Sequence, residues 1–311
     1  MNSSRILSLV GLFSLSAVVA VAAIERTVEK TFAVAGAGTL RVETQAGAVR
    51  VTTSKENVVK ISARQTIRAG SEREADELLQ KLELTFDQSG NDLKVISKYE
   101  KKPSGWSFGS WPPVKVDIIV TVPASFAADL RTSGGDIAVG DLMGKLSART
   151  SGGSIKLGKM GNEVDARTSG GNISLEDANG PVVLDTSGGN ITAGRVAGSA
   201  RLSTSGGNIK VDSAMGSLHA NTSGGNIRAK IVGALKEDCS VTTSGGTVKV
   251  SVDKMAGFKL DASTSGGSVD ISGLSVETTS KSRSKLAGNG NGGGPLLKVR
   301  SSGGSVEVAA N

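Results

Sequence analysis

Three arginines at equal spacing are the residues in this sequence best suited to binding an anion. Arg131, Arg149 and Arg167 stand 18 residues apart, each directly before a T-S-G-G block. If successive blocks stack as strands at about 4.8 Å per step, their guanidinium groups form a row on one outer face. Unpaired cations in such a row repel one another, so the row predicts contact with an anionic partner. A solvated face that keeps the protein soluble is the alternative.

Two further groups of side chains are candidates for ligand contact. Lys210, Arg228 and Lys249 form a second line of cations on another face. An aromatic segment between two lysines and two prolines contains Trp106, Phe108 and Trp111. An exposed aromatic loop is suited to stacking on sugars or resting on a lipid surface. Packing of a hairpin tip onto the first coil is the ordinary alternative for these aromatic residues.

The residue types needed for catalysis do not come together in the sequence. The single histidine, His219, occupies an outward position, and the repeat serines have no histidine beside them to act as a base. The single cysteine, Cys239, falls in an apolar column, which predicts a small buried side chain and leaves no partner for an intramolecular disulfide. Outward acids are scattered among columns, unlike the clusters of solenoid lyases: Asp165, Asp185, Asp212 and Asp261. We therefore expect no enzymatic activity, no metal and no cofactor.

A repeated T-S-G-G block organises most of the chain. Its serine stands at positions 133, 151, 169, 187, 205, 223, 244 and 265, and a variant, S-S-G-G, has its second serine at 302. The spacings are 18 five times, 21 twice and then 37. A fixed period this short is typical of stacked supersecondary units.

Alternating apolar residues flank each block and predict two strands per repeat. Four positions after the serine the residue is always Ile or Val, from Ile137 to Val306, and two positions later it is again apolar. The residue between them is mostly polar, so this segment points apolar side chains inward with a period of two. Apolar residues also stand three and five positions before the serine. A third apolar position follows nine residues after the serine, at Leu142, Met160, Ala178, Val196, Ala214 and Val232.

These patterns predict an all-β, single-stack β-solenoid of 18–21-residue coils spanning residues 126–311. Glycine pairs suit corners that need positive φ or a close approach of backbones. Each pair is followed by a small polar residue, Asn at four successive coils, which predicts a structural hydrogen-bond ladder along the axis. The composition agrees, because two Trp, one Tyr and six Phe stand against 42 Gly, and a thin solenoid has no room for large aromatics.

The segment before the repeats predicts an export signal and a cap. Residues 1–23 carry Arg5, an apolar stretch and small residues before the end, which is typical of a cleaved signal peptide. An uncleaved membrane anchor is the alternative. Removing this segment lowers the net charge of +7 by one, since it holds no acid. Residues 24–125 predict a β-rich cap with one helix near 71–82, started by a capping box of Ser71 and Glu74.

A Gly/Asn/Ser-rich stretch at residues 278–294 predicts a mobile loop before the last coil. It carries Lys281, Arg283 and Lys285. The coil that ends at Asn311 is then the open end of the stack, where pairing with another copy is an expected mode of self-association.

Three stretches of the sequence resemble one known family: "EKTFAV…GTLRVETQAGAVRV", "VDIIVTVPASFAADLRTSGGDIAV" and "GNGGGPLLKVRSSGGSVEV". They resemble the DUF4097 family, which is described as proposed adhesins with β-strand repeats. The resemblance covers nearly the whole chain after the signal segment. It implies an extracytoplasmic β-solenoid and carries over no catalytic residue.

Together these observations predict a non-enzymatic, exported protein of the cell envelope or surface, located in the periplasm, at the cell surface or in the medium. The expected partner is an envelope glycan, an anionic polymer or a protein, with no nucleic acid. The alternative is a structural or regulatory periplasmic protein that contacts a membrane sensor or another envelope protein. An ice-binding function is disfavoured, because the repeated threonines, Thr132 to Thr264, share the parity of inward positions.

Overall fold

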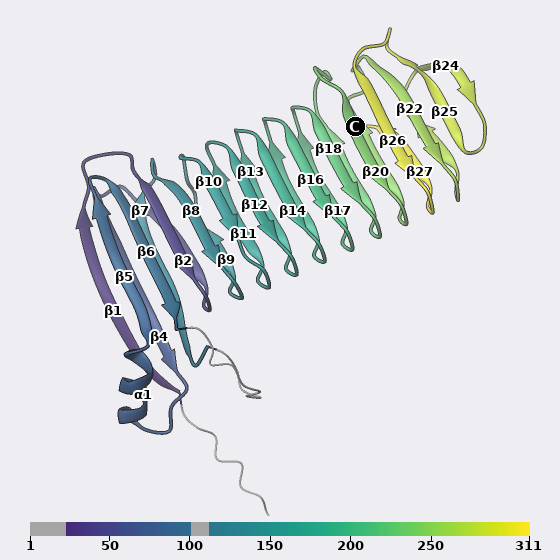
Figure 1. Ribbon diagram of the computed structural model, residues 1–311. Helices are drawn as coiled ribbons and strands as arrows, with labels where there is room; N and C mark the ends of the chain where they lie inside the picture. The colour runs from purple at the N-terminus through teal and green to yellow at the C-terminus, as the bar shows by residue number, and fades with distance from the viewer. Residues whose placement is uncertain (1–22, 101–111) are drawn as a thin grey trace, which may run out of the picture.

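The structure is a computed structural model of the chain, and it describes residues 23–100 and 112–311. Almost all of the regular structure in those residues is β-strand, arranged as one elongated stack of coils (Figure 1). Each repeat coil gives one strand to a 13-stranded sheet, here sheet A, and one to a 14-stranded sheet, here sheet B. The predicted single-stack β-solenoid is confirmed.

Sheet A contains, in spatial order, β1 (Ile24–Ala33), β4 (Val58–Ile67), β7 (Val114–Pro123), β3 (Val49–Ser54), β9 (Ile137–Val139), β11 (Ile155–Met160), β13 (Ile173–Ala178), β15 (Ile191–Val196), β17 (Ile209–Ala214), β19 (Ile227–Ile231), β21 (Val248–Val252), β27 (Val306–Ala310) and β23 (Val269–Ser272). Sheet B contains, starting from the opposite end of the stack, β24 (Val276–Lys281), β25 (Lys285–Gly290), β22 (Phe258–Thr264), β26 (Leu296–Ser301), β20 (Cys239–Thr243), β18 (Leu218–Thr222), β16 (Ala200–Thr204), β14 (Val182–Thr186), β12 (Val164–Thr168), β10 (Leu146–Arg149), β8 (Ala127–Thr132), β2 (Thr39–Thr44), β6 (Asp92–Tyr99) and β5 (Leu82–Ser89).

The repeat strands are parallel and in register, so equivalent residues stack. Ile155 lies between Ile137 and Ile173 in sheet A, and all three are buried. The apolar columns thus form one continuous core along the axis. The third column departs from the prediction at Val232, which is only half-buried. The register between β17 and β19 shifts there, and Ile231 takes the inward place beside Ala214.

The T-S-G-G corner requires its second glycine for a steric reason. A Cβ built on Gly189 would lie 1.9 Å from the carbonyl oxygen of Gly171 in the preceding coil. A Cβ on the first glycine, Gly188, would meet nothing closer than 3.6 Å. None of the T-S-G-G glycines has positive φ. Close approach of stacked backbones therefore explains why glycine recurs at this corner in every coil, and a left-handed conformation does not.

The predicted asparagine ladder is confirmed beside this corner. The side-chain oxygen of Asn190 accepts the backbone N–H of Asn208 at 2.8 Å and its side-chain amide at 3.2 Å. The same pattern links Asn172 to Asn190 and Asn208 to Asn226. Each link joins one coil to the next through exposed side chains, so the column is structural.

The segment before the repeats contributes coils as well as a cap. Helix α1 (Glu72–Leu79) begins after Ser71, whose hydroxyl accepts the N–H of Glu74 at 3.2 Å. Strands β2 and β3 pair in parallel with β8 and β9, so this early segment forms a true coil of the stack. Strands β6 and β7 lie outside it, and β4, β1 and β5 close that end. No helix in residues 23–100 or 112–311 has the length and apolarity to cross a membrane.

The last coil in sequence is not the last coil in space. Strand β26 lies between β20 and β22, and β27 lies between β21 and β23. The side-chain amide of Asn311 donates a hydrogen bond of 2.7 Å to the carbonyl of Ile231, which lies on β19 in an earlier coil. The expectation of an open C-terminal coil ending at Asn311 is therefore wrong.

The predicted loop at residues 278–294 is also corrected. Most of it belongs to β24 and β25, an antiparallel pair that extends sheet B beyond β22 (Figure 1). Small side chains allow the close packing of β25, since Gly290 faces the ring of Phe258. A Gly- and Asn-rich composition thus fits a tightly packed strand here as well as a loop.

Candidate interaction surface

The three repeat arginines lie in one row on the outer face of sheet B. Arg131 aligns with Arg149, and Arg149 aligns with Arg167, across parallel strands β8, β10 and β12. The stacking predicted from the 18-residue spacing is confirmed. The row extends to Glu43 on one side and to Asp185 on the other.

Carboxylates beside the row neutralise it. Asp165 accepts Arg149 at 2.6 Å and Arg167 at 2.8 Å. Asp129 accepts Arg131 at 3.2 Å and lies 3.4 Å from Arg41. The hydrogen bond to Asp165 is the main reason that the pKa of Arg167 is raised above its ordinary value.

The premise that this arginine row is unpaired is therefore wrong. Each acid stands two residues before an arginine on the same strand, so both side chains point outward and meet. The D-x-R pattern of Asp129 with Arg131, and of Asp165 with Arg167, was the sequence signal for this pairing. Glu43 and Asp185 lie at the two ends of the row. Together with Asp129 and Asp165 they give four carboxylates, which balance the four guanidinium groups of Arg41, Arg131, Arg149 and Arg167.

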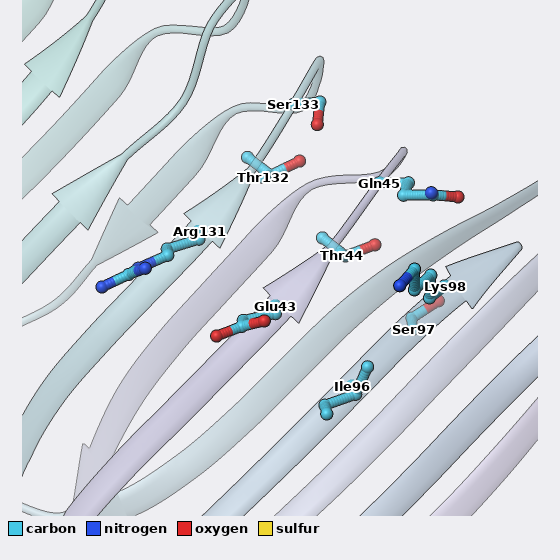
Figure 2. A pocket seen from close by; sticks show the side chains of 9 residues that line it. All are labelled: Glu43, Thr44, Gln45, Ile96, Ser97, Lys98, Arg131, Thr132 and Ser133. Carbon is cyan, nitrogen blue, oxygen red and sulfur yellow. The ribbon is translucent and has the colours of Figure 1, made fainter. Parts of the chain in front are cut away.

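A shallow pocket of about 270 Å³ adjoins the first arginine of the row, where β2, β6 and β8 end (Figure 2). Glu43, Lys98 and Arg131 supply its charges, and the remaining lining is Thr44, Gln45, Ile96, Ser97, Thr132 and Ser133. The Thr132 hydroxyl already donates to the carbonyl of Gly47 at 3.0 Å. No histidine or cysteine lines this pocket.

The second predicted line of cations has a different charge balance. Lys210, Arg228 and Lys249 align across β17, β19 and β21 on the outer face of sheet A. Lys210 pairs with Asp212 at 2.8 Å, and Lys249 pairs with Glu307 at 2.6 Å.

Strand β19, at the centre of this line, carries two cations that lack an acidic partner. Arg228 and Lys230 are exposed, and neither forms an ion pair with any residue in the described ranges. We name Lys210, Arg228, Lys230 and Lys249 the basic patch, which sets four cations against two carboxylates. Lys230 was missed from sequence, although its position two residues after Arg228 on the same strand was the available signal.

Of the other candidate residues, those that the structure describes do not join either surface. Trp106, Phe108 and Trp111 lie outside the described residues. His219 lies on β18 beside Arg201 and Ser240, and it is half-buried. Cys239 is buried, and its burial raises the pKa of the thiol, as expected of a structural cysteine. No group of three or more His, Cys, Asp or Glu side chains suited to a metal ion occurs in the part of the chain described here.

Comparison with solved structures finds several proteins that align over most of this chain at low sequence identity. A proposed cell adhesion protein from Clostridium sporogenes is 12% identical, with 92% of this chain and 100% of that chain covered and a TM-score of 0.29. A proposed adhesin from Bacteroides fragilis is 11% identical, with 92% and 97% covered and a TM-score of 0.38. A proposed lipid-binding protein from Parabacteroides distasonis is 14% identical, with 91% and 96% covered and a TM-score of 0.46.

No curated protein matches this chain in sequence. The Toastrack DUF4097 family model, by contrast, matches residues 37–309, which include every T-S-G-G block, both cationic surfaces and all the strands except β1 and the last residue of β27. The chain therefore belongs to the Toastrack DUF4097 family.

Proposed function

We propose that this protein is a non-enzymatic, exported binding protein of the cell envelope or cell surface, and that its basic patch contacts an anionic envelope polymer. The observation that carries the proposal is the absence of an acidic partner for Arg228 and Lys230 among the described residues, in the middle of an exposed cationic line.

A repeating anion fits this surface better than a small one. The cations of the patch project from neighbouring parallel strands, which are about 4.8 Å apart and held rigidly by the core. A polymer with regularly spaced negative groups contacts several of them at once, and each contact is weak by itself. The flat outer face of a sheet suits such an extended ligand.

The neutralised arginine row is a weaker candidate for the same role. An anion that contacts Arg149 or Arg167 competes with Asp165, which already holds both at hydrogen-bond distance. The basic patch has fewer such competitors. The two surfaces therefore give a matched comparison within one protein.

The test is co-sedimentation of the protein with isolated cell-envelope fractions across a salt series. We expect binding that weakens as salt rises, because screening shortens the reach of charge–charge attraction. The double substitution Arg228→Ala and Lys230→Ala is expected to weaken binding about 30-fold, at roughly 1 kcal/mol per basic residue near an anionic surface. Arg149→Ala with Arg167→Ala is the control and leaves binding nearly unchanged.

Two outcomes would overturn this assignment. If both double variants lose binding equally, the net charge of the protein explains the binding, and the basic patch has no special role. No binding by the unchanged protein would favour the alternative of a structural or regulatory protein that contacts a membrane sensor or another envelope protein. Export itself is tested by locating the protein in fractionated cells and determining its N-terminal residue, with cleavage after residue 22 or 23 expected.

A further inference from the structure

Each sheet has a strand with a free edge at both ends of the stack. In sheet A these strands are β1 and β23, and in sheet B they are β5 and β24. Among the described residues each pairs with one neighbouring strand only, for example β1 with β4 and β24 with β25. On β23 one outer donor is already used, because the N–H of Val269 donates to the carbonyl of Arg283 at 2.9 Å. The unpaired side of an edge strand is a template on which another strand can pair.

The apolar core is also incompletely covered at both ends. The half-buried hydrophobic residues that pack against it gather in the terminal units. At the N-terminal end they are Ile24, Val28, Phe32, Leu78, Leu79, Leu82, Leu84 and Phe86, and at the C-terminal end they are Ile271, Leu274 and Val276. Helix α1 covers part of the N-terminal end. Each end therefore combines a free backbone edge with exposed apolar surface.

The two ends carry opposite charge. At the N-terminal end Glu25, Glu29, Glu83 and Asp87 are exposed and form no ion pair within the described ranges. The exposed Lys94 and Lys98 of β6 lie opposite Asp87 and Glu83. Strands β1 and β5 and helix α1 together carry eight carboxylates and three cations, so this end is acidic on balance. At the C-terminal end the exposed cations without an ion pair in those ranges are Lys281, Arg283 and Lys285, beside the exposed carboxylates of Asp270 and Glu277. Two N-terminal ends repel each other, whereas an N-terminal and a C-terminal end attract.

The ends are offset in opposite senses. Beyond the coil of β6 and β7, sheet A adds two strands, β4 and β1, and sheet B adds only β5. Beyond the coil of β22 and β23, sheet B adds β25 and β24, and sheet A adds none. Sheet A thus protrudes at the N-terminal end and sheet B protrudes at the C-terminal end. When a second copy approaches in the same orientation, the protruding sheet of each end meets the shorter edge of the same sheet in the other copy.

Strand direction allows both sheets to continue across such a contact. Strand β1 runs the same way as the repeat strands of sheet A, because it is separated from β7 by two antiparallel pairings. Strand β23 is parallel to the same strands. In sheet B, β5 is antiparallel to β6, so it meets β24 of another copy in the antiparallel sense.

We propose that copies of this chain associate head to tail, with the β23–β24 end of one protomer docked on the β1–β5 end of the next. The contact joins a basic end to an acidic end and covers apolar residues that both ends leave half-exposed. It is heterologous, so it extends into linear assemblies and does not stop at a two-fold dimer. The contact does not depend on the ligand of the basic patch.

The test is sedimentation velocity on the full chain, produced with its natural N-terminus and purified in the form that the host yields. We expect the average mass to rise with concentration beyond that of a dimer. A C-terminal-end variant, Lys281→Glu with Arg283→Glu and Lys285→Glu, is expected to lower the association constant at least tenfold. An N-terminal-end variant, Glu25→Lys with Glu29→Lys and Glu83→Lys, is expected to do the same. Lys156→Glu with Arg201→Glu, in the middle of the stack, is the control.

Mixing the two end variants separates loss of contact from loss of folding. Each variant keeps one native end, and the two altered ends carry opposite charge, so the mixture is expected to regain assemblies that neither variant forms alone. A protein that stays monomeric at every concentration overturns the proposal. So does association that only one end variant weakens, because that result indicates a symmetric contact through a single end.

Discussion

The hydroxyl of Thr186 donates a hydrogen bond of 2.9 Å to the carbonyl oxygen of Gly171, one coil earlier in the stack. The same hydroxyl accepts the N–H of Gly189 at 3.3 Å. Thr168, Thr204 and Thr222 make equivalent bonds, and Ser301 does so in the last coil. One buried side chain thus satisfies two backbone groups and links neighbouring coils.

Replacing Thr186 by Val is expected to destabilise the protein by about 1–3 kcal/mol, since the half-buried carbonyl of Gly171 and the buried N–H of Gly189 both lose the hydroxyl as partner. Thr186→Ser keeps the hydroxyl, and Ser301 shows that serine fits the corner, so this variant should lose less. The measurement is the free energy of unfolding in urea. Thr192→Val, at an exposed position on sheet A, is the control. Equal stability of the two valine variants would contradict a stabilising role for the buried hydroxyl.

Substituting alanine in one T-S-G-G pair should have very different effects at its two glycines. Gly189→Ala places a methyl group against the carbonyl of Gly171 and is expected to cost about 2–3 kcal/mol as the coils are forced apart. Gly188→Ala meets only ordinary van der Waals distances and should be nearly neutral. Thermal unfolding of both variants distinguishes these positions. Similar midpoints would show that close backbone approach is not what requires glycine.

The substitution Asp165→Asn should convert the arginine row into an anion-binding surface. Arg149 and Arg167 both lose their carboxylate partner, so salt-sensitive binding to envelope fractions is expected to rise several-fold. The stability loss should be about 1 kcal/mol or less, as is usual for exposed ion pairs. Asp177→Asn removes the partner of Arg195 on the other sheet and serves as a control of equal charge. Unchanged binding by Asp165→Asn would mean that the row is not accessible to the polymer.

Cys239 should be inert in the folded protein. Burial raises the pKa of its thiol, so alkylation by iodoacetamide at pH 8.5 is expected to be slow until urea unfolds the chain. The thiolate forms at lower pH in the unfolded chain than in the folded one. The stability that this group contributes is therefore complete below its ordinary pKa of 9.0 and falls as the pH rises above it.

Comparing the unfolding free energy of Cys239→Ala with that of the unchanged protein at pH 8 and pH 10 isolates this contribution. The difference between the two proteins should shrink at the higher pH. Rapid alkylation under folding conditions, or a pH-independent difference, would contradict a buried thiol.

The core columns could be predicted from the sequence, because a strand with one buried face must alternate with a period of two. The position of Thr186 follows from the same parity. Its bridging hydrogen bonds do not, since they depend on how closely two corners approach. The charge balance does not follow from the spacing between coils, because it is set by neighbours along one strand, where Asp165 stands beside Arg167 and Lys230 stands beside Arg228.

The order of the coils at the C-terminal end could not be predicted from the repeats. Every T-S-G-G coil presents similar edges, so the sequence pattern does not say which coils are neighbours. The spacing of 37 residues before the last block was the one sign of an irregular connection. The strands β24 and β25 within it replace the predicted loop.

The position of β26 and β27 between earlier coils has a consequence for the order of folding. Synthesis proceeds from the N-terminus, so β22 and β23 are complete before the strands that finally separate them from β20 and β21. During that interval β22 and β23 have a vacant, chemically similar edge on which to dock one layer too early. Reaching the native order then requires that premature pairing to be avoided or undone. A chain that stops before residue 296 therefore lacks an inner layer of the stack, so coils on both sides of that layer lose a neighbouring strand in each sheet.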